Sequence, residues 1–235
     1  MGQKSAPPRP APRLYLATPI VDDPAQLAAE LPAALAAADV AAVLVRLKPA
    51  DPRTMVSRVK ALAPIIQASG AALLFDGQAL DGQFELVARS GADGAHFVGI
   101  AAMEGAMPAL KPDRIVGVGG LATRHDSMTA GEQGADYVLF GETDAHGQRP
   151  SREAIAERLG WWAELFEPPC VAYAATPDEA QEFVAAGADF ILACDLVWSD
   201  PRGAAAALAE LGKAIGEAFA STSQKGQSRT EVSET

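Results

Sequence analysis

Short apolar runs recur along the chain, and longer stretches with apolar residues at every third or fourth position separate them. Runs of four to six apolar residues, bounded by glycine, proline or polar residues, are typical of strands that are buried on both faces. Eight such runs predict strands over residues 13–18, 41–46, 71–76, 94–97, 114–118, 137–141, 170–174 and 190–194.

The stretches between these runs have the periodicity of amphipathic helices. In residues 52–69, for example, Val56, Val59, Leu62 and Ile65 fall on one helical face. Glycine ends several of the stretches, as expected where a helix stops. The pattern predicts helices over residues 24–38, 52–69, 80–90, 103–110, 125–133, 151–166, 177–186 and 203–220.

A segment that occurs three times contains both the end of a predicted helix and the start of a predicted strand. GADGAHFVG (residues 91–99), GADYVLFGE (134–142) and GADFILACD (187–195) each begin with a glycine, turn through Ala-Asp and continue into a mostly apolar run. The interval between copies holds one helix, one strand and one further helix. Each copy is therefore interpreted as the junction between a helix and the next strand of an α/β protein.

Eight strands that alternate with helices over about 210 residues indicate a (β/α)₈ TIM barrel in a single domain. A doubly wound open sheet is the alternative, although no G-x-G-x-x-G follows the first strand. The barrel is predicted to occupy residues 13–220. A flexible proline-rich leader over residues 1–12 and a disordered tail over residues 221–235 are expected to flank it.

Composition narrows the function classes. The chain has 235 residues, 49% hydrophobic content, a net charge of −11 and an isoelectric point near 4.7. A nucleic-acid surface or an anionic-membrane surface would need a clustered basic patch, so neither partner is expected. No apolar run reaches the length of about 18 residues that a membrane span needs. Cys170 and Cys194 are interpreted as small buried residues, and the chain is predicted to be cytoplasmic.

Ligands bind at the carboxyl ends of barrel strands, so polar residues at those ends are the candidates. Arg46 and Lys48 would hold a phosphate or diphosphate, or would simply begin a solvated loop. Asp76 ends an apolar run and would need a metal, a cation or solvent. The full set of strand-end candidates is Thr18, Arg46, Lys48, Asp76, His96, Gly119, Gly120, Glu142 and Asp195.

Two further features lie near the sixth predicted strand. Residues 142–150 form a long polar loop, a place where binding residues concentrate. Trp161 and Trp162 are expected to serve helix packing rather than an aromatic ligand site, with at least one ring against the sheet or a neighbouring subunit. Gly117, Gly119 and Gly120 would permit close approach of a ligand, or form only a turn.

In their order along the chain, the segments LYLAT, VRLK, LLFD, GADGAHF, GVGG, GADYVLFG and GADFILA resemble the family of thiamine phosphate synthase and thiazole tautomerase. The resemblance covers residues 13–219, and its most specific pieces are GADGAHF and ADYVLFG. Both enzymes are single (β/α)₈ barrels. The synthase joins an aminopyrimidine methyl diphosphate to a thiazole phosphate, with Mg²⁺ on the diphosphate, and releases pyrophosphate.

The resemblance assigns roles to individual residues. It implies that Arg46 and Lys48 hold the diphosphate, that Asp76 binds Mg²⁺ and that His96 takes the place of the family's histidine. Gly141 matches the glycine of the family's Gly-Pro loop. Thr18, Gly119, Gly120, Gly141, Glu142, Ala174 and Asp195 are accordingly expected to contact a small phosphorylated substrate, and a homodimer is a further expectation.

The sequence also departs from the family's pattern. Leu44 replaces a glutamine, Ala174-Ala175-Thr176 replaces a glycine-rich phosphate cradle, and Asp195 replaces a serine. These changes predict weak binding of thiazole phosphate, because Cβ atoms would crowd the amide groups and a carboxylate would repel the phosphate. The tautomerase's histidine has its nearest counterpart in His125, offset by three or four positions.

Three functions follow from this combination of matches and departures. The first is a divergent thiamine phosphate synthase. The second is a tautomerase-like isomerase that uses His125 or His96 as its acid and base. The third is a non-catalytic relative that binds a ligand or a partner at the former active site.

Overall fold

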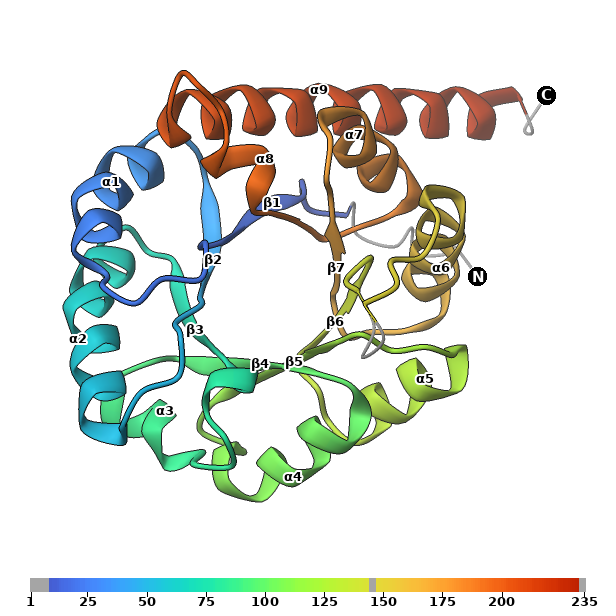
Figure 1. Cartoon of the computed structure of the whole chain (residues 1–235). Coiled ribbons are helices and arrows are strands. Elements are labelled where there is room, and N and C mark those ends of the chain that lie inside the picture. The colour runs from blue at the N-terminus through green and yellow to red at the C-terminus, as the bar shows by residue number, and fades with distance from the viewer. Residues whose placement is uncertain (1–8, 144–146, 233–235) are drawn as a thin grey trace.

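The computed structural model describes residues 9–143 and 147–232, with side chains as far as residue 223. Eight parallel strands close into a barrel in sequence order, as predicted (Figure 1). The strands are β1 (Arg13–Ala17), β2 (Val40–Val45), β3 (Ala72–Asp76), β4 (Gly94–Val98), β5 (Ile115–Gly119), β6 (Tyr137–Phe140), β7 (Cys170–Tyr173) and β8 (Phe190–Ala193).

Helices surround the barrel and cover its outer face (Figure 1). They are α1 (Ala25–Ala36), α2 (Pro52–Ala68), α3 (Glu85–Ser90), α4 (Ile100–Leu110), α5 (Arg124–Glu132), α6 (Arg152–Leu165), α7 (Pro177–Ala186), α8 (Asp195–Trp198) and α9 (Ala204–Val232), with a 3₁₀ turn at Gly77–Ala79. The helix expected from residue 80 begins only at Glu85, because Asp81 and Gly82 take positive φ angles of 45° and 76°. The 3₁₀ turn and α8 were not predicted.

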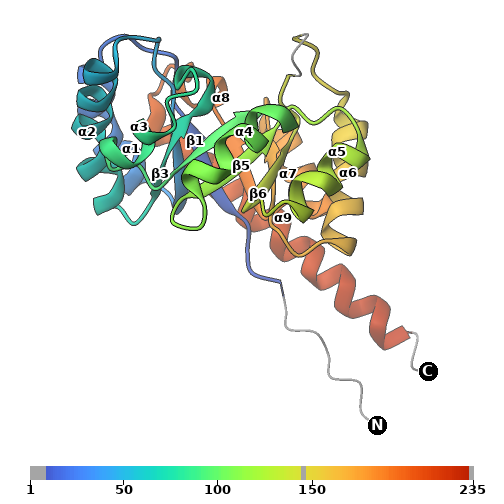
Figure 2. The ribbon, with the colours of Figure 1, turned by 90° about the horizontal axis from the view of Figure 1, so that it is seen from below.

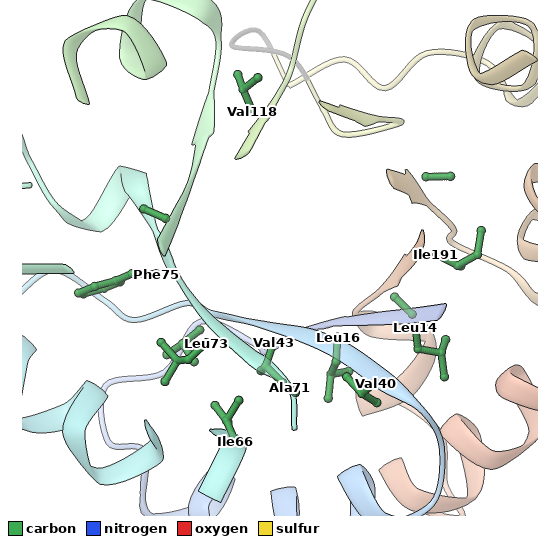
Figure 3. Packing of buried hydrophobic residues seen from close by; sticks show 14 of the residues in the cluster. Leu14, Leu16, Val40, Val43, Ile66, Ala71, Leu73, Phe75, Val118 and Ile191 are labelled. Carbon is green, nitrogen blue, oxygen red and sulfur yellow. The ribbon is translucent and has the colours of Figure 1, made fainter. Parts of the chain in front are cut away.

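Side chains alternate between the two faces of each strand. Leu14, Leu16, Val43, Leu73 and Phe75 point outward and pack against the helices, where Ile66 of α2 joins them (Figure 3). A smaller cluster fills the barrel interior. It consists of Tyr15, Ala17, Leu44, Leu74, Tyr137, Leu139, Val171, Leu192 and Cys194. The outer cluster is built from apolar side chains, whereas the inner face also carries the hydroxyls of Tyr15 and Tyr137.

The repeated Gly-Ala-Asp segments have a structural role. Gly91 and Gly187 end α3 and α7 in the left-handed conformation, which glycine adopts without steric cost. The aspartates that follow accept backbone N–H bonds from the preceding strand: Asp93 from Leu73 at 2.8 Å, Asp136 from Val116 at 2.7 Å and Asp189 from Cys170 at 2.8 Å. These bonds lie at the amino-terminal side of the barrel, where such features contribute to stability.

Two observations concern the segments that flank the barrel in the sequence, where a flexible leader and a disordered tail were predicted. Arg9 forms an ion pair of 2.8 Å with Asp189, although it falls within the expected leader; residues 1–8 lie outside the described part. The expected tail from Ser221 is helical as far as Val232, because α9 continues without a break. Absence of hydrophobic periodicity indicates that a helix has no packing surface, but it does not prevent i→i−4 bonding. Figure 2 shows the last turns of α9 leaving the barrel.

Two smaller predictions are confirmed. Trp162 is completely buried and meets Phe140 of β6 edge to face at 5.9 Å, so one indole does pack on the outer sheet face. Cys170 and Cys194 are both buried free thiols. In the part of the chain that the structure describes, no helix is long and apolar enough to cross a membrane.

Candidate functional site

A cavity of about 510 Å³ opens at the carboxyl ends of the strands. Arg46, Asp76 and His96 all line it, as expected for polar residues that the barrel gathers at the carboxyl ends of its strands. Glu142 closes the side opposite Arg46, because β2 and β6 lie across the barrel from each other. The wall consists of Ala17, Ile20, Leu44, Arg46, Asp76, Gln78, His96, Val98, Glu142, Thr143, Gly147, Tyr173, Leu192 and Cys194.

Arg46 is fixed at the edge of this cavity. Its Nε donates to the carbonyl of Thr18 at 2.6 Å, and its Nη2 lies 2.7 Å from Cys194 Sγ. Burial raises the pKa of the Cys194 thiol to about 11, so the sulfur is uncharged at neutral pH and does not neutralise the guanidinium. Thr18 is completely buried and its Oγ1 accepts the backbone N–H of Arg46. Thr18 therefore positions Arg46 and does not line the cavity.

Asp76 ends β3 and accepts the backbone N–H of Gln78 at 3.0 Å. Burial raises the pKa of the Asp76 carboxyl, while that hydrogen bond and the nearby His96 and Arg46 oppose the rise. No group of three or more His, Cys, Asp or Glu side chains among the described residues could hold a metal ion. Mg²⁺ commonly binds through one or two carboxylates together with substrate phosphates and waters. Asp76 therefore fits a Mg²⁺ ion that arrives with a diphosphate.

A chain of hydrogen bonds crosses the barrel interior and reaches the cavity. Tyr137 Oη lies 2.9 Å from Tyr15 Oη and 2.9 Å from His96 Nδ1. His96 Nε2 lies 3.0 Å from Glu142 Oε2, and the His96 ring stacks on the Tyr137 ring with 7° between the planes. Burial raises the pKa of both tyrosines, so both phenols keep their protons at neutral pH. His96 is 1% exposed and lies between a phenol and a carboxylate.

Two glycines on the inner face of β5 make room for this chain. A Cβ atom at Gly117 would overlap the Tyr137 ring, and one at Gly119 would overlap Glu142 Oε2. Gly120 and Gly141 have positive φ angles of 63° and 96°, which allow the strand-end turns beside the cavity. Gly117, Gly119 and Gly120 were expected to admit a ligand or to form a turn. In the structure, Gly117 and Gly119 instead admit side chains of the protein itself.

A second, smaller cavity of about 220 Å³ adjoins the first and shares Glu142 with it. Arg149 and Arg158 line it. Arg149 binds the carbonyls of Gly141 and Tyr173 and forms an ion pair of 2.8 Å with Glu179. This arginine fastens the end of the polar loop that follows β6. Sequence reasoning selected that loop but missed Arg149, whose partners lie 8 to 30 positions away in the sequence.

Several predicted site residues do not line the large cavity. Lys48 is exposed and pairs with Asp22 at 2.8 Å, and His125 is exposed at the start of α5. Asp195 is exposed at the start of α8, with its Oδ1 3.6 Å from Cys194 Sγ. Ala174 is completely buried, and its amide donates to the carbonyl of Leu192 at 2.9 Å. Their functional roles stay predictions.

Comparison with known proteins places this geometry in a family. The family model described as thiamine monophosphate synthase matches residues 14–196, more than three quarters of the chain. The chain belongs to this family. The thiamine-phosphate synthase of Rhodospirillum centenum is 42% identical over 207 residues, which cover 86% of this chain and 97% of that protein. The thiamine-phosphate synthase of Hyphomonas neptunium is 37% identical over 216 residues, covering 87% and 94% of the two chains.

Solved structures support the fold independently. Thiamine phosphate pyrophosphorylase from Pyrococcus furiosus superimposes with a TM-score of 0.69 at 22% sequence identity, covering 88% of this chain and 96% of that one. At this identity the likeness concerns the barrel and not the chemistry. This member of the thiamine monophosphate synthase family has a cationic Arg46 and an acidic Asp76 at neighbouring strand ends, and its Leu44 gives the cavity an apolar wall.

Asp76 yields a prediction on pH dependence in this family member. Because the folded-state pKa of Asp76 is raised, its contribution to stability is present below the unfolded pKa of about 3.9 and is lost as the pH rises through the folded value. Asp76→Asn keeps the acceptor for Gln78 N–H and should therefore increase the free energy of unfolding near pH 8. Urea unfolding from pH 4 to 8 should show this gain shrinking toward pH 4, whereas exposed Asp113→Asn should show no such trend. A gain that is independent of pH would contradict the assignment.

Proposed function

We propose that this chain is a thiamine-phosphate synthase, which condenses hydroxymethylpyrimidine diphosphate with thiazole phosphate and releases pyrophosphate. The convergence of Arg46, Asp76 and His96 on one cavity carries the proposal. Family membership and 42% identity to a thiamine-phosphate synthase support it. A phosphorylated small-molecule substrate, a cytoplasmic location and a homodimer belong to the same proposal.

The residues account for a dissociative reaction. The bond between the pyrimidine methylene carbon and the diphosphate oxygen breaks, and its electron pair leaves with the diphosphate. The thiazole nitrogen then donates its lone pair to the methylene carbon, which forms the new C–N bond without any proton transfer. Arg46 stabilises the negative charge that develops on the diphosphate, because its guanidinium is fixed before the reaction begins. When bound at Asp76, Mg²⁺ supplies further stabilisation of that charge.

Apolar surface on the inner wall suits the intermediate. Leu44, Leu192 and Val98 line the cavity beside the charged groups. Water would capture a pyrimidine methyl cation, so exclusion of water favours capture by the thiazole. Tyr173 adds a half-buried ring to the same wall. The arrangement thus separates a charged region for the diphosphate from an apolar region for the reacting rings.

The two alternative functions gain little from the described residues. A tautomerase would need an acid and a base beside the thiazole, yet His125 is exposed and does not line the cavity. His96 does line it, but both ring nitrogens already have partners in Tyr137 and Glu142. A non-catalytic relative would not need Arg46 held by two contacts at the cavity edge. The synthase reaction is therefore the one that we retain.

A direct assay tests the proposal. Purified protein with Mg²⁺ and both substrates should release pyrophosphate and form thiamine phosphate in equal amounts, and omission of thiazole phosphate should abolish product formation. Asp76→Ala should lower the rate by at least about 100-fold, because one carboxylate then no longer holds the metal. Exposed Asp113→Ala is the matched control and should keep the full rate. Absence of product from folded wild-type protein would reject the synthase.

A further inference from the structure

Glu142 differs in character from the other polar groups of the cavity. It lies across the barrel from Arg46, on the side where no described lysine or arginine lines the cavity. Its side chain is 20% exposed, and His96 Nε2 lies 3.0 Å from Oε2. A carboxylate accepts hydrogen bonds and repels phosphate, so this side of the cavity suits a ligand group that carries N–H or O–H donors.

The hydrogen-bond chain fixes the direction of this contact. An ionised carboxylate can only accept, so the proton between His96 and Glu142 resides on Nε2. The chain continues from His96 Nδ1 to the Tyr137 hydroxyl and from there to the Tyr15 hydroxyl. The buried groups thus orient Glu142 through His96. The His96 bond uses one acceptor position, and a carboxylate has about four.

Gly119 provides a second, independent observation that the fold reserves space for the Glu142 carboxylate. Every other side chain would place a Cβ on Glu142 Oε2, and that Cβ would also come within 3.3 Å of His96 Cε1. The glycine therefore leaves the space that the carboxylate occupies. Glu142 follows Gly141, whose positive φ of 96° turns the chain so that the next residue reaches the cavity.

We infer that Glu142 recognises the exocyclic amino group of the pyrimidine substrate and that His96, Tyr137 and Tyr15 act as positioning residues for it. This inference rests on the proposed function. Of the two ring systems in that reaction, only the aminopyrimidine carries ring-bound N–H donors; the thiazole nitrogen is an acceptor. The amino group and the diphosphate-bearing methylene occupy adjacent carbons of the pyrimidine ring. A substrate whose diphosphate reaches Arg46 and Asp76 therefore turns its amino edge to the neighbouring part of the wall, where His96 pairs with Asp76 across the strands and Glu142 lies beside His96.

The same contact assists the chemistry. When the diphosphate departs, the amino nitrogen donates electron density through the ring to the methylene carbon, and its hydrogens become more acidic. A carboxylate that accepts one of them binds more strongly in the transition state than in the ground state, which is the condition for catalysis. Glu142 therefore contributes to both affinity and rate, while no proton needs to leave the amine.

Calorimetric titration without thiazole phosphate tests the inference separately from turnover. The probes are hydroxymethylpyrimidine diphosphate, its analogue with hydrogen in place of the amino group, and inorganic diphosphate, all with Mg²⁺. Wild-type protein should bind the amino compound about 10- to 100-fold more tightly than the analogue, the weight of a hydrogen bond to a charged group. Glu142→Gln and Gly119→Ala should lose most of this preference and keep the affinity for inorganic diphosphate. Surface Glu132→Gln should change neither value.

Each outcome decides the matter. An unchanged preference in both variants, or no preference in wild type, overturns the role of Glu142 even if the protein makes thiamine phosphate. If Glu142→Gln binds inorganic diphosphate and the amino compound more tightly by the same factor, the substitution has only removed a repulsive charge. That result also overturns the role of Glu142. A Glu142-dependent preference in a protein that forms no product rejects the synthase proposal and keeps the recognition of an aminopyrimidine.

Discussion

Arg46→Ala should lower kcat/KM for the formation of thiamine phosphate by about 100- to 1000-fold, the usual effect of removing one preorganised donor from developing negative charge. The guanidinium is held by the Thr18 carbonyl and lies beside an uncharged Cys194 thiol, so its charge is available to a ligand. Most of the loss should appear in kcat, because charge on the diphosphate grows as its bond to carbon breaks.

Steady-state rates of pyrophosphate release measure this effect. Arg46→Lys keeps the charge but cannot reproduce the fixed fork of donors, and we expect it to recover only part of the rate. Exposed Arg53→Ala serves as the matched control and should retain wild-type kinetics. Thermal melting of each variant separates a lost charge from a lost fold. Full activity in folded Arg46→Ala would remove the guanidinium from the mechanism.

The barrel could be predicted because its signals are local. Each Gly-Ala-Asp segment places a helix stop, a turn and a buried strand within nine residues, and the aspartate forms its strand bond nearby. Period-two alternation then assigns each strand residue to the inside or the outside. The shared rim of the strand ends correctly put Arg46, Asp76 and His96 at one cavity: Asp76 ends β3, Arg46 follows β2 directly and His96 lies two residues before the end of β4.

The alternation rule failed where a strand had already ended. Lys48 was expected to hold a phosphate together with Arg46, which needs alternation to continue past Val45, but β2 ends at Val45 and Leu47 forms an isolated bridge with Val21. Beyond that point the chain turns, and Lys48 meets Asp22 at the surface. Alternation holds only while the backbone stays in a regular strand.

Long-range partners explain the residues that were missed. Tyr137 sits in an apolar run and looks like an ordinary strand residue, yet its hydroxyl is shared with groups 41 and 122 positions away. Nothing local in the sequence distinguishes it from a packing aromatic. A useful sign was present on β5, where two glycines at alternate inward positions leave space for a neighbouring ring and a carboxylate.

The phosphate cradle shows the limit of residue-by-residue matching. Ala174 and Asp195 were selected because they replace residues of the family pattern. In the structure, the amide of Ala175 is already bound by Glu179 Oε2 at 2.8 Å, and Arg149 pairs with that carboxylate. The hydrogen bond from Arg149 lowers the pKa of the Glu179 carboxyl, so it stays ionised at neutral pH. The Glu179 carboxylate of α7 thus already accepts the Ala175 N–H that a phosphate would need. Sequence matching alone did not reveal this hydrogen bond.

Trp162→Ala should lower the free energy of unfolding by about 3–5 kcal/mol, the largest loss that we expect from a single side chain outside the active site. The indole is completely buried, stacks on Phe166 at 4.2 Å and donates from Nε1 to the Pro168 carbonyl at 2.7 Å. Truncation would leave a large cavity between α6 and β6 and an unpaired carbonyl.

The neighbouring indole provides the control for this experiment. Trp161 is only partly buried and lies under the Arg124 guanidinium at 4.9 Å, so Trp161→Ala should cost no more than about 1–2 kcal/mol. Urea unfolding followed by circular dichroism measures both values. The stability loss of Trp162→Phe should fall between these two values, because phenylalanine keeps much of the packing and loses the N–H bond.

Because α6 begins where Arg149 fastens the loop after β6, folded Trp162→Ala should also bind substrate more weakly than Trp161→Ala. Equal stability losses for the two alanine variants would show that the α6–β6 contact does not depend on the buried ring.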